Sequence, residues 1–295
     1  MIWRDQKLYL LMLAPSIGIL LLFIGAPIGQ SFLLSLHRII IGLPQLQTPF
    51  VGLGNYGELF MDPVARHSFG ITLAFVSVTT FFELLIGLLL ALLIHRRFPA
   101  RGALRASVLI PWAIPTVVAA QMWRFLLNDA YGMVNYTLFG ADTIRYIPWL
   151  AQPRTALAAL IIADIWKTSS FAALLILAGL QVIPEELHQA AKVDGAGPWR
   201  RFRHITWPLV RPAMLVALLF RTIDAFRVFD LAFVMTQGGP ADATNVLQLY
   251  GYKKMFVEGW MGYGSAISVF IFMVVLGLAI LYVRLVGRRL MEAGP

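Results

Sequence analysis

Six long apolar runs dominate this 295-residue sequence. They lie at about 8–36, 69–94, 104–127, 156–182, 209–235 and 264–287. Each exceeds the roughly 20 residues that a helix needs to cross the hydrocarbon core of a bilayer. Backbone polar groups cannot stay unpaired in lipid, so runs without strand-like alternation must be helical. We therefore predict an all-α, polytopic membrane protein with six transmembrane helices.

Composition supports this class and excludes several others. The chain is 59% hydrophobic with a mean hydropathy of +0.75, beyond the range of ordinary soluble domains. The run at 8–36 is too long for the apolar part of a signal peptide, so we expect it to stay as the first helix. The sequence has no cysteine, no phosphate-binding glycine loop and no histidine spacing that suits a metal. We predict one transmembrane domain over 1–295 with no cofactor and no metal.

The distribution of positive charge predicts the orientation. The N-terminal segment, the second-to-third loop, the fourth-to-fifth loop and the C-terminal segment together carry 14 Lys and Arg residues, and the other loops carry 6. The positive-inside rule places the richer set, and hence both termini, in the cytoplasm. This asymmetry also explains the net charge of +9, so we do not expect a nucleic-acid partner.

The polar stretch 184–212 separates the fourth and fifth runs on the predicted cytoplasmic side. Pro184 followed by two glutamates suits the first turn of a helix. Asp194-Gly195 then predicts a sharp reversal, because glycine tolerates a positive φ. Pro198 suits the start of a second short helix, on which Trp199, Phe202 and Ile205 share a face. We predict a helix–turn–helix element at the membrane surface, where it can dock a partner.

This stretch resembles the EAA loop of binding-protein-dependent ABC importer permeases. The family pattern is EAA, three residues, Gly, nine residues and then Ile-x-Leu-Pro; here Gln189-Ala190-Ala191, Gly195 and Ile205-Thr206-Trp207-Pro208 match its spacing. Gln189 replaces the family glutamate and Trp207 replaces the leucine. Four further pieces resemble sugar-importer permeases of the maltose-transporter type, in the right order: Val51-Gly52-Leu53-Gly54-Asn55-Tyr56, Pro111-Trp112-Ala113-Ile114-Pro115, Thr236-Gln237-Gly238-Gly239-Pro240 and Gly264-Ser265-Ala266-Ile267-Ser268. The sequence as a whole is most similar in appearance to trehalose-importer permeases.

The resemblance implies a type I importer (MetI-like) fold with a core at about 69–287 and a coupling loop at 184–208. It implies a subunit without catalytic residues, in a bacterial cytoplasmic membrane, that moves a disaccharide such as trehalose or maltose by alternating access. The implied partners are a second homologous permease, two ATPase subunits and an extracytoplasmic sugar-binding lipoprotein. The loop 185–205 would enter a cleft of an ATPase. The residues expected to couple there are Glu185, Glu186, Leu187, Gln189, Ala190, Ala191, Asp194, Gly195, Ala196, Trp199 and Phe202.

An alternative role for the loop needs no protein partner. Its arginines can anchor an amphipathic segment to anionic lipid headgroups. The spacing of the family pattern favours coupling over this alternative.

Charged residues within the fourth and fifth runs are candidates for a substrate pathway, because intramembrane charges are costly. Planar charged groups also form strong hydrogen bonds with sugar hydroxyls. The resemblance places sugar contacts near Asp164, Lys167, Thr168 and Phe171 on one helix and near Arg221, Asp224, Ala225 and Val228 on the other. Equally, Asp164–Lys167 and Arg221–Asp224–Arg227 could be structural ion pairs. Glu83 and Arg124, single charges on the second and third runs, are assigned to structure or to an interface.

Two other classes of function remain as alternatives. An ion-coupled secondary transporter could use the same charges without an ATPase, and a membrane-embedded enzyme would need a cluster of catalytic side chains that the sequence does not offer. Our hypothesis is the permease subunit of an ATP-driven sugar importer.

Overall fold

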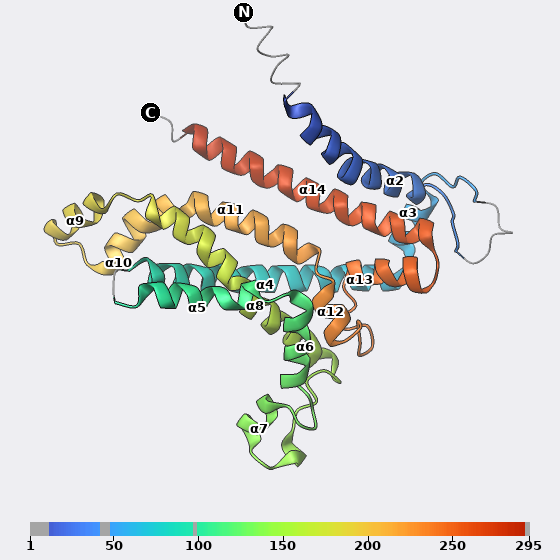
Figure 1. Cartoon of the computed structure of the whole chain (residues 1–295), viewed down its shortest axis with the longest axis horizontal. Helices are drawn as coiled ribbons and strands as arrows, with labels where there is room; N and C mark the ends of the chain where they lie inside the picture. Colours follow the sequence, from blue (N-terminus) through green and yellow to red (C-terminus); the bar gives the residue numbers. More distant parts are fainter. Residues whose placement is uncertain (1–11, 42–47, 97–98, 293–295) are drawn as a thin grey trace, which may run out of the picture. The chain divides into compact units, whose positions relative to one another are not determined.

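The computed structural model describes residues 12–41, 48–96 and 99–292, with side chains as far as Arg284. It divides into two compact units, one formed by Met1–Arg66 and Tyr250–Met273 and the other by His67–Leu249 and Val274–Pro295. The described part is helical, with two isolated β-bridges and no strand (Figure 1). The predicted all-α class is confirmed.

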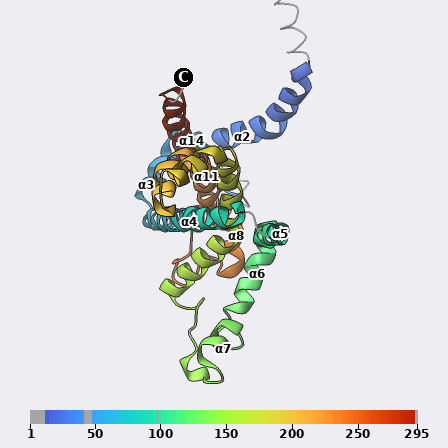
Figure 2. The same cartoon turned by 90° about the vertical axis from the view of Figure 1, so that its left-hand side faces the viewer.

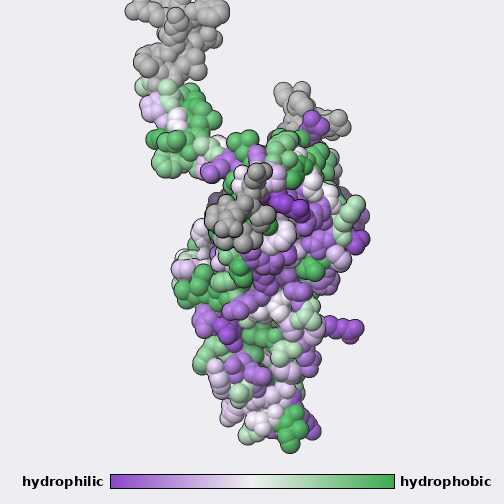
Figure 3. All heavy atoms as spheres, turned by 90° about the vertical axis from the view of Figure 1, so that its right-hand side faces the viewer, coloured by the Kyte–Doolittle hydropathy of each residue, from purple (hydrophilic) through white to green (hydrophobic). Residues whose placement is uncertain are grey.

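The first unit contains short helices together with the first part of the long helix α14 (Met261–Glu292). It contains α2 (Ala26–Ser35), which follows a π-helical turn at Leu21–Gly25, and α3 (Gly54–Met61). It also contains the end of α13 (Leu247–Tyr252), a second π-helical turn at Lys253–Val257 and the first part of α14 (Met261–Glu292). The helix Met12–Ser35 exposes hydrophobic side chains (Figure 3), and its most apolar stretch is not buried within the protein. A surface of this kind suits lipid as its environment.

A hydrogen-bonded cluster joins three helices of this unit. The Asp62 carboxylate accepts hydrogen bonds from the hydroxyls of Tyr250 and Tyr263, and its second oxygen accepts one from the backbone N–H of Val64 at 2.8 Å. Asp62 therefore caps the start of α4 (Pro63–His95) and ties it to α13 and α14.

The second unit holds the longest helices and the polar stretch 184–212. After α4 come α5 (Arg101–Ala113), α6 (Thr116–Leu126), α7 (Met133–Phe139), a 3₁₀ turn at Thr143–Arg145 and α8 (Pro153–Gln181). The chain continues through α9 (Glu185–Val193), α10 (Pro198–Arg201), a π-helical turn at Phe202–Thr206, α11 (Trp207–Phe226) and α12 (Asp230–Met235). Within this unit α9 and α10 lie at one end of α8 and α11, and α12 lies at the other (Figure 1).

Small residues bring three of these helices close together. A Cβ atom at Gly87 would lie 2.8 Å from the Cβ of Ala172, and one at Gly179 would collide with the Cβ of Ala213. The α4–α8 and α8–α11 contacts therefore both depend on glycine, as is common between helices in membranes. Next to these contacts lies a hydrophobic core formed by Leu88, Ala91, Ile94, Ile176, Leu177, Leu180, Val210 and Ala217.

The third apolar run is not the straight helix expected from the sequence. It is divided into α5 and α6, whose axes differ by 90° (Figure 2). Pro115 has no N–H to continue the helix, and its ring holds Ile114 in an extended conformation with ψ 129°. The bend is therefore encoded by a proline that lies inside an apolar run.

The fifth apolar run is also interrupted. α11 ends at Phe226, and α12 begins at Asp230, whose carboxylate suits the first turn of a helix. In the described residues, four helices are long and apolar enough to span a membrane, or five if the bent pair counts as one. α11 is not among them, because its 20 residues leave no stretch of 18 that avoids any of the three charged residues Arg211, Arg221 and Asp224.

Candidate functional site

A buried ion network links α4, α8 and α11. The Arg221 guanidinium is 3% exposed, and Glu83 is completely buried. Arg221 Nε donates to Glu83 Oε2 at 2.7 Å, and Nη2 donates to Oε1 at 3.0 Å. This is a bidentate pair of the strong, geometrically specific kind. It joins residues that are 138 positions apart in the sequence.

Three more residues complete the network. The Thr168 hydroxyl lies 2.6 Å from Glu83 Oε1, and Asp164 Oδ2 lies 3.6 Å from Arg221 Nη2. Arg221 Nη1 donates to Asp224 Oδ2 at 3.1 Å, although the Asp224 side chain is 63% exposed. The network thus extends from a dry centre at Glu83 to an accessible carboxylate at Asp224.

One acceptor in this network is unused. Asp164 Oδ2 is buried and accepts no hydrogen bond from any described residue. Buried polar atoms are almost always satisfied, so such an atom requires an explanation. Asp164 lies near Arg221 Nη2 and the exposed Asp224 carboxylate near Nη1, so both carboxylates provide acceptor groups next to this guanidinium.

The remaining predicted pathway residues surround the network without joining it. Lys167 makes no ion pair within 4 Å among the described residues, so the suggested Asp164–Lys167 pair does not form, although Lys167 lies within electrostatic range of Asp164. Phe171 stacks on Trp112 at 5.6 Å between ring centroids and meets Phe220 edge-on at 6.4 Å.

Ala225 and Val228 complete the comparison with the predicted pathway. Ala225 is buried in α11, and Val228 lies half-buried between α11 and α12. The Arg221–Asp224 pair suggested from the sequence does form, while Arg227 makes no ion pair among the residues that the structure describes.

Glu83 has a larger role than its isolated position in the sequence indicated. A single carboxylate in an apolar helix needs a partner that neutralises its charge, so its presence in the sequence already indicates a buried ion pair. The partner could not be identified, because α4 and α11 are brought together only by the fold.

The exposed segment 184–208 matches its predicted conformation closely. α9 begins directly after Pro184 and has both glutamates in its first turn. It ends in a Schellman motif, in which the N–H of Ala196 donates to the Ala191 carbonyl at 2.8 Å and the N–H of Gly195 donates to that of Lys192 at 3.1 Å. Gly195 has φ +75°, as the reversal requires.

The second half of the segment contains one exposed and one partly buried aromatic side chain, those of Trp199 and Phe202. Trp199 is 70% exposed and stacks on Phe202 at 5.6 Å. Phe202 packs partly against the hydrophobic core, and its ring also lies 6.3 Å from that of Trp207. The outer part of the segment therefore offers an unpartnered apolar surface on a well-anchored base, to which Leu187 and Val193 add exposed side chains.

All eleven predicted coupling residues lie in this segment. α9 carries Glu185, Glu186, Leu187, Gln189, Ala190 and Ala191; the turn contains Asp194, Gly195 and Ala196; α10 and the π-helical turn carry Trp199 and Phe202. The segment directly connects α8 to α11, the two helices that carry most of the ion network.

Comparison with known proteins gives consistent relatives. Residues 83–292 match the family model described as "Binding-protein-dependent transport system inner membrane component". The chain is 43% identical over 288 residues to the trehalose/maltose transport system permease protein MalF of Thermococcus litoralis, covering 97% of this chain and 95% of that protein. It is 38% identical over 283 residues to the trehalose transport system permease protein SugA of Mycobacterium tuberculosis, with coverage of 96% and 90%.

A solved structure shows the same fold over the whole chain. A chain of the bacterial alginate ABC transporter, crystallised in complex with its alginate pentasaccharide-bound periplasmic protein, superposes with a TM-score of 0.82. The two chains are 25% identical, and the match covers 100% of this chain and 98% of the other.

Proposed function

The chain belongs to the family of inner-membrane components of binding-protein-dependent transport systems, and on this premise we propose that it is a permease subunit of an ATP-driven sugar importer. It is a multi-pass membrane protein and a transporter subunit, not an enzyme. ATP hydrolysis then belongs to separate chains, and this chain converts their closing motion into alternating access.

One geometric observation carries the proposal. The exposed segment 184–208 is covalently continuous with α8 and α11. These two helices carry Asp164, Thr168 and Asp224 near the buried guanidinium of Arg221. A force on the segment therefore reaches the polar groups within the membrane through two helices that pack directly on each other at Gly179 and Ala213. An importer driven by soluble ATPases needs a connection of this kind.

The substrate class follows from the relatives and from the chemistry of the network. Relatives at 43% and 38% identity are named as trehalose/maltose and trehalose permeases, so a disaccharide of this type is the proposed substrate. The acceptors at Asp164 and Asp224 suit sugar hydroxyls, and the Phe171 ring can face a pyranose. The proposed pathway comprises Asp164, Lys167, Thr168, Phe171, Arg221, Asp224, Ala225 and Val228.

The proposed assembly has four kinds of component besides the bilayer. They are this chain, a second homologous permease, two ATPase subunits and an extracytoplasmic sugar-binding protein. The coupling loop 184–208 would enter an ATPase cleft through the eleven residues described above. The proposed topology has six spans around a core at 69–287, with α11 as the fifth span and both termini in the cytoplasm.

Reconstitution tests the proposal directly. The four-component complex is placed in proteoliposomes, and ATP hydrolysis and uptake are measured across a panel of disaccharides, with a peptide and a divalent metal ion as controls. We expect trehalose or maltose to stimulate both ATP hydrolysis and uptake. A flat response to all sugars contradicts the substrate class, and uptake by this chain alone, without ATPases, indicates an ion-coupled secondary transporter instead.

A further inference from the structure

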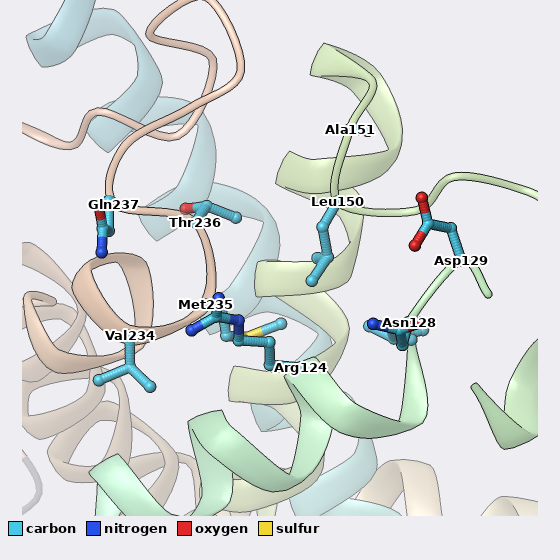
Figure 4. Close-up of a pocket in the computed structure, with 10 residues that line it drawn as sticks. Arg124, Asn128, Asp129, Leu150, Ala151, Val234, Met235, Thr236 and Gln237 are labelled. Carbon is cyan, nitrogen blue, oxygen red and sulfur yellow. The ribbon is translucent and has the colours of Figure 1, made fainter. Parts of the chain in front are cut away.

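A cavity of about 380 Å³ lies within the second unit, at the ends of α6 and α12 (Figure 4). Its polar lining includes Arg124, Asn128, Asp129 and Gln237, and Leu150 and Met235 contribute to its walls. The volume falls at the lower end of the roughly 300–1,000 Å³ that is usual for small-molecule sites. The cavity is separate from the ion network, and none of the predicted pathway residues lines it.

Three polar side chains around this cavity, those of Arg124, Asp129 and Gln237, are exposed and not engaged with other described protein groups. Arg124 and Asp129 make no ion pair within 4 Å, and neither they nor Gln237 form a side-chain hydrogen bond within the described ranges. In Figure 4 the Arg124 side chain extends along the cavity toward Met235, and Asp129 lies on the opposite wall. A guanidinium, a carboxylate and an amide thus border one hollow without neutralising one another.

The rim is held rigidly. Gln237 has φ +53°, a conformation that persists in a non-glycine residue only where the surroundings enforce it. The enforcing contacts come from Thr244, which is fully buried, lies 2.6 Å from the hydroxyl of Thr236 and donates to the Gly239 carbonyl at 2.7 Å. On the other side, the Asn128 side-chain oxygen accepts from Ala130 N at 2.9 Å, which leaves its amide N–H groups free to donate. The backbone that carries Gln237 and the Asn128 side chain are therefore both held in place by hydrogen bonds.

The position of the cavity relative to α8 indicates the membrane surface at which it lies. Leu150 and Ala151 precede the start of α8 at Pro153, whereas the segment 184–208 follows its end at Gln181. A helix of 29 residues is about 43 Å long, more than the thickness of the hydrocarbon core. The cavity and the coupling segment thus belong to opposite membrane surfaces, and Asp164 lies between them, about 16 Å along the helix from Pro153.

We propose that this cavity is an outer sugar-binding site, which holds the substrate on the extracytoplasmic side before it reaches the ion network. The inference rests on the proposed function, because that function supplies the sugar and the orientation. Arg124 and the Asn128 amide donate to sugar hydroxyls, Asp129 accepts from them, and Gln237 does both. The apolar walls at Leu150 and Met235 face the carbon skeleton.

Equilibrium binding tests the proposal. The complex of both permeases and the ATPases is held in nanodiscs without nucleotide or binding protein and titrated with radiolabelled trehalose. We expect saturable binding that Arg124→Met weakens at least fivefold and Gln237→Ala weakens about threefold. The matched control is Arg145→Met, because Arg145 is an exposed arginine paired with Asp142 at 3.2 Å outside the cavity; it should stay within twofold.

The outcomes separate this inference from the proposed function. Absence of saturable trehalose binding, or equal affinity in wild type and both cavity variants, overturns the outer site even if the wild-type complex imports the sugar. Failure of the wild-type complex to import any sugar contradicts the proposed function itself. If the variants bind trehalose normally but lose stimulation of ATP hydrolysis by the binding protein, the cavity is a protein contact and the sugar site is excluded. Gel filtration of each variant complex checks assembly.

Discussion

The ion network and the segment 184–208 both involve α8 and α11, but they are built in opposite ways. The centre of the network is dry, its central pair is 138 residues apart in the sequence, and it is stabilised by charge. The segment is exposed, closes its own turn within six residues and leaves Trp199 without a deep pocket of its own. The difference indicates that one region resists change while the other is shaped to receive a partner.

We expect the largest loss of stability when one charge is removed from the network. Arg221→Met leaves Glu83 buried and unpaired, which should cost about 3–5 kcal/mol of stability. The measurement is the melting temperature of the purified complex. A wild-type melting temperature in this variant contradicts a buried pair.

A double variant then separates stability from function. Glu83→Gln combined with Arg221→Met removes both charges and should recover much of the melting temperature. Recovery of uptake as well assigns the pair to structure alone, whereas stable complexes that do not transport place Arg221 in the pathway.

A second, smaller effect tests the conformation of the segment. Gly195→Val forces a β-branched residue to φ +75°, and we expect sugar uptake to fall at least tenfold while the chain still inserts. Gly197→Val is the matched control. A Cβ atom at either glycine would meet no neighbouring atom within 4 Å, but Gly197 has φ −65°, which valine adopts without strain. Equal loss in both variants refutes the requirement for a positive φ.

A third prediction concerns the surface that the segment presents. Trp199→Ala should weaken association with the ATPases about tenfold, because exposed tryptophans are frequent energetic centres of interfaces. The melting temperature of the permease pair alone should not change. Phe256→Ala, at an aromatic residue that is 63% exposed outside the segment, should leave the affinity unaltered, and titration of ATPase into nanodiscs measures both.

The smallest effect lies outside both regions. Burial raises the pKa of Asp62, but hydrogen bonds from Tyr250, Tyr263 and the backbone outweigh it, so the pKa lies below its usual value. A carboxylate of lowered pKa stabilises the fold above about pH 4 and loses that contribution as the pH falls through its folded pKa. Asp62→Asn should lower stability by about 1 kcal/mol at pH 7 and less at pH 3, without uncoupling transport. Thermal melts of both proteins at the two pH values measure the difference.

The segment was predictable from the sequence because its determinants are local. Pro184, Asp194-Gly195 and Pro198 each act on the next few residues, so helix starts and the reversal followed from pattern alone. The apolar runs were equally clear. The bend at Ile114–Pro115 carried a proline signal, yet the uninterrupted apolar composition favoured a straight span.

The sequence identified candidate residues of the network but not the contacts between them. Asp164, Arg221 and Asp224 were recognisable as intramembrane charges, but pairing between α4 and α11 depends on packing at Gly87 and Gly179. Lys167 illustrates the limit, because its spacing from Asp164 allowed a pair that Arg221 takes instead. The cavity beside Arg124 is likewise created by segments that are distant in the sequence.

The glycine contacts at Gly87 and Gly179 have a mechanical consequence. Helices that touch through backbone and methyl groups have no flexible side chains between them to absorb a movement, so we expect α4, α8 and α11 to tilt together. A tilt of about 10° would displace the far end of a helix about 43 Å long by about 7 Å. The articulation must then lie where the helices are already broken, at Ile114–Pro115 and between Phe226 and Asp230.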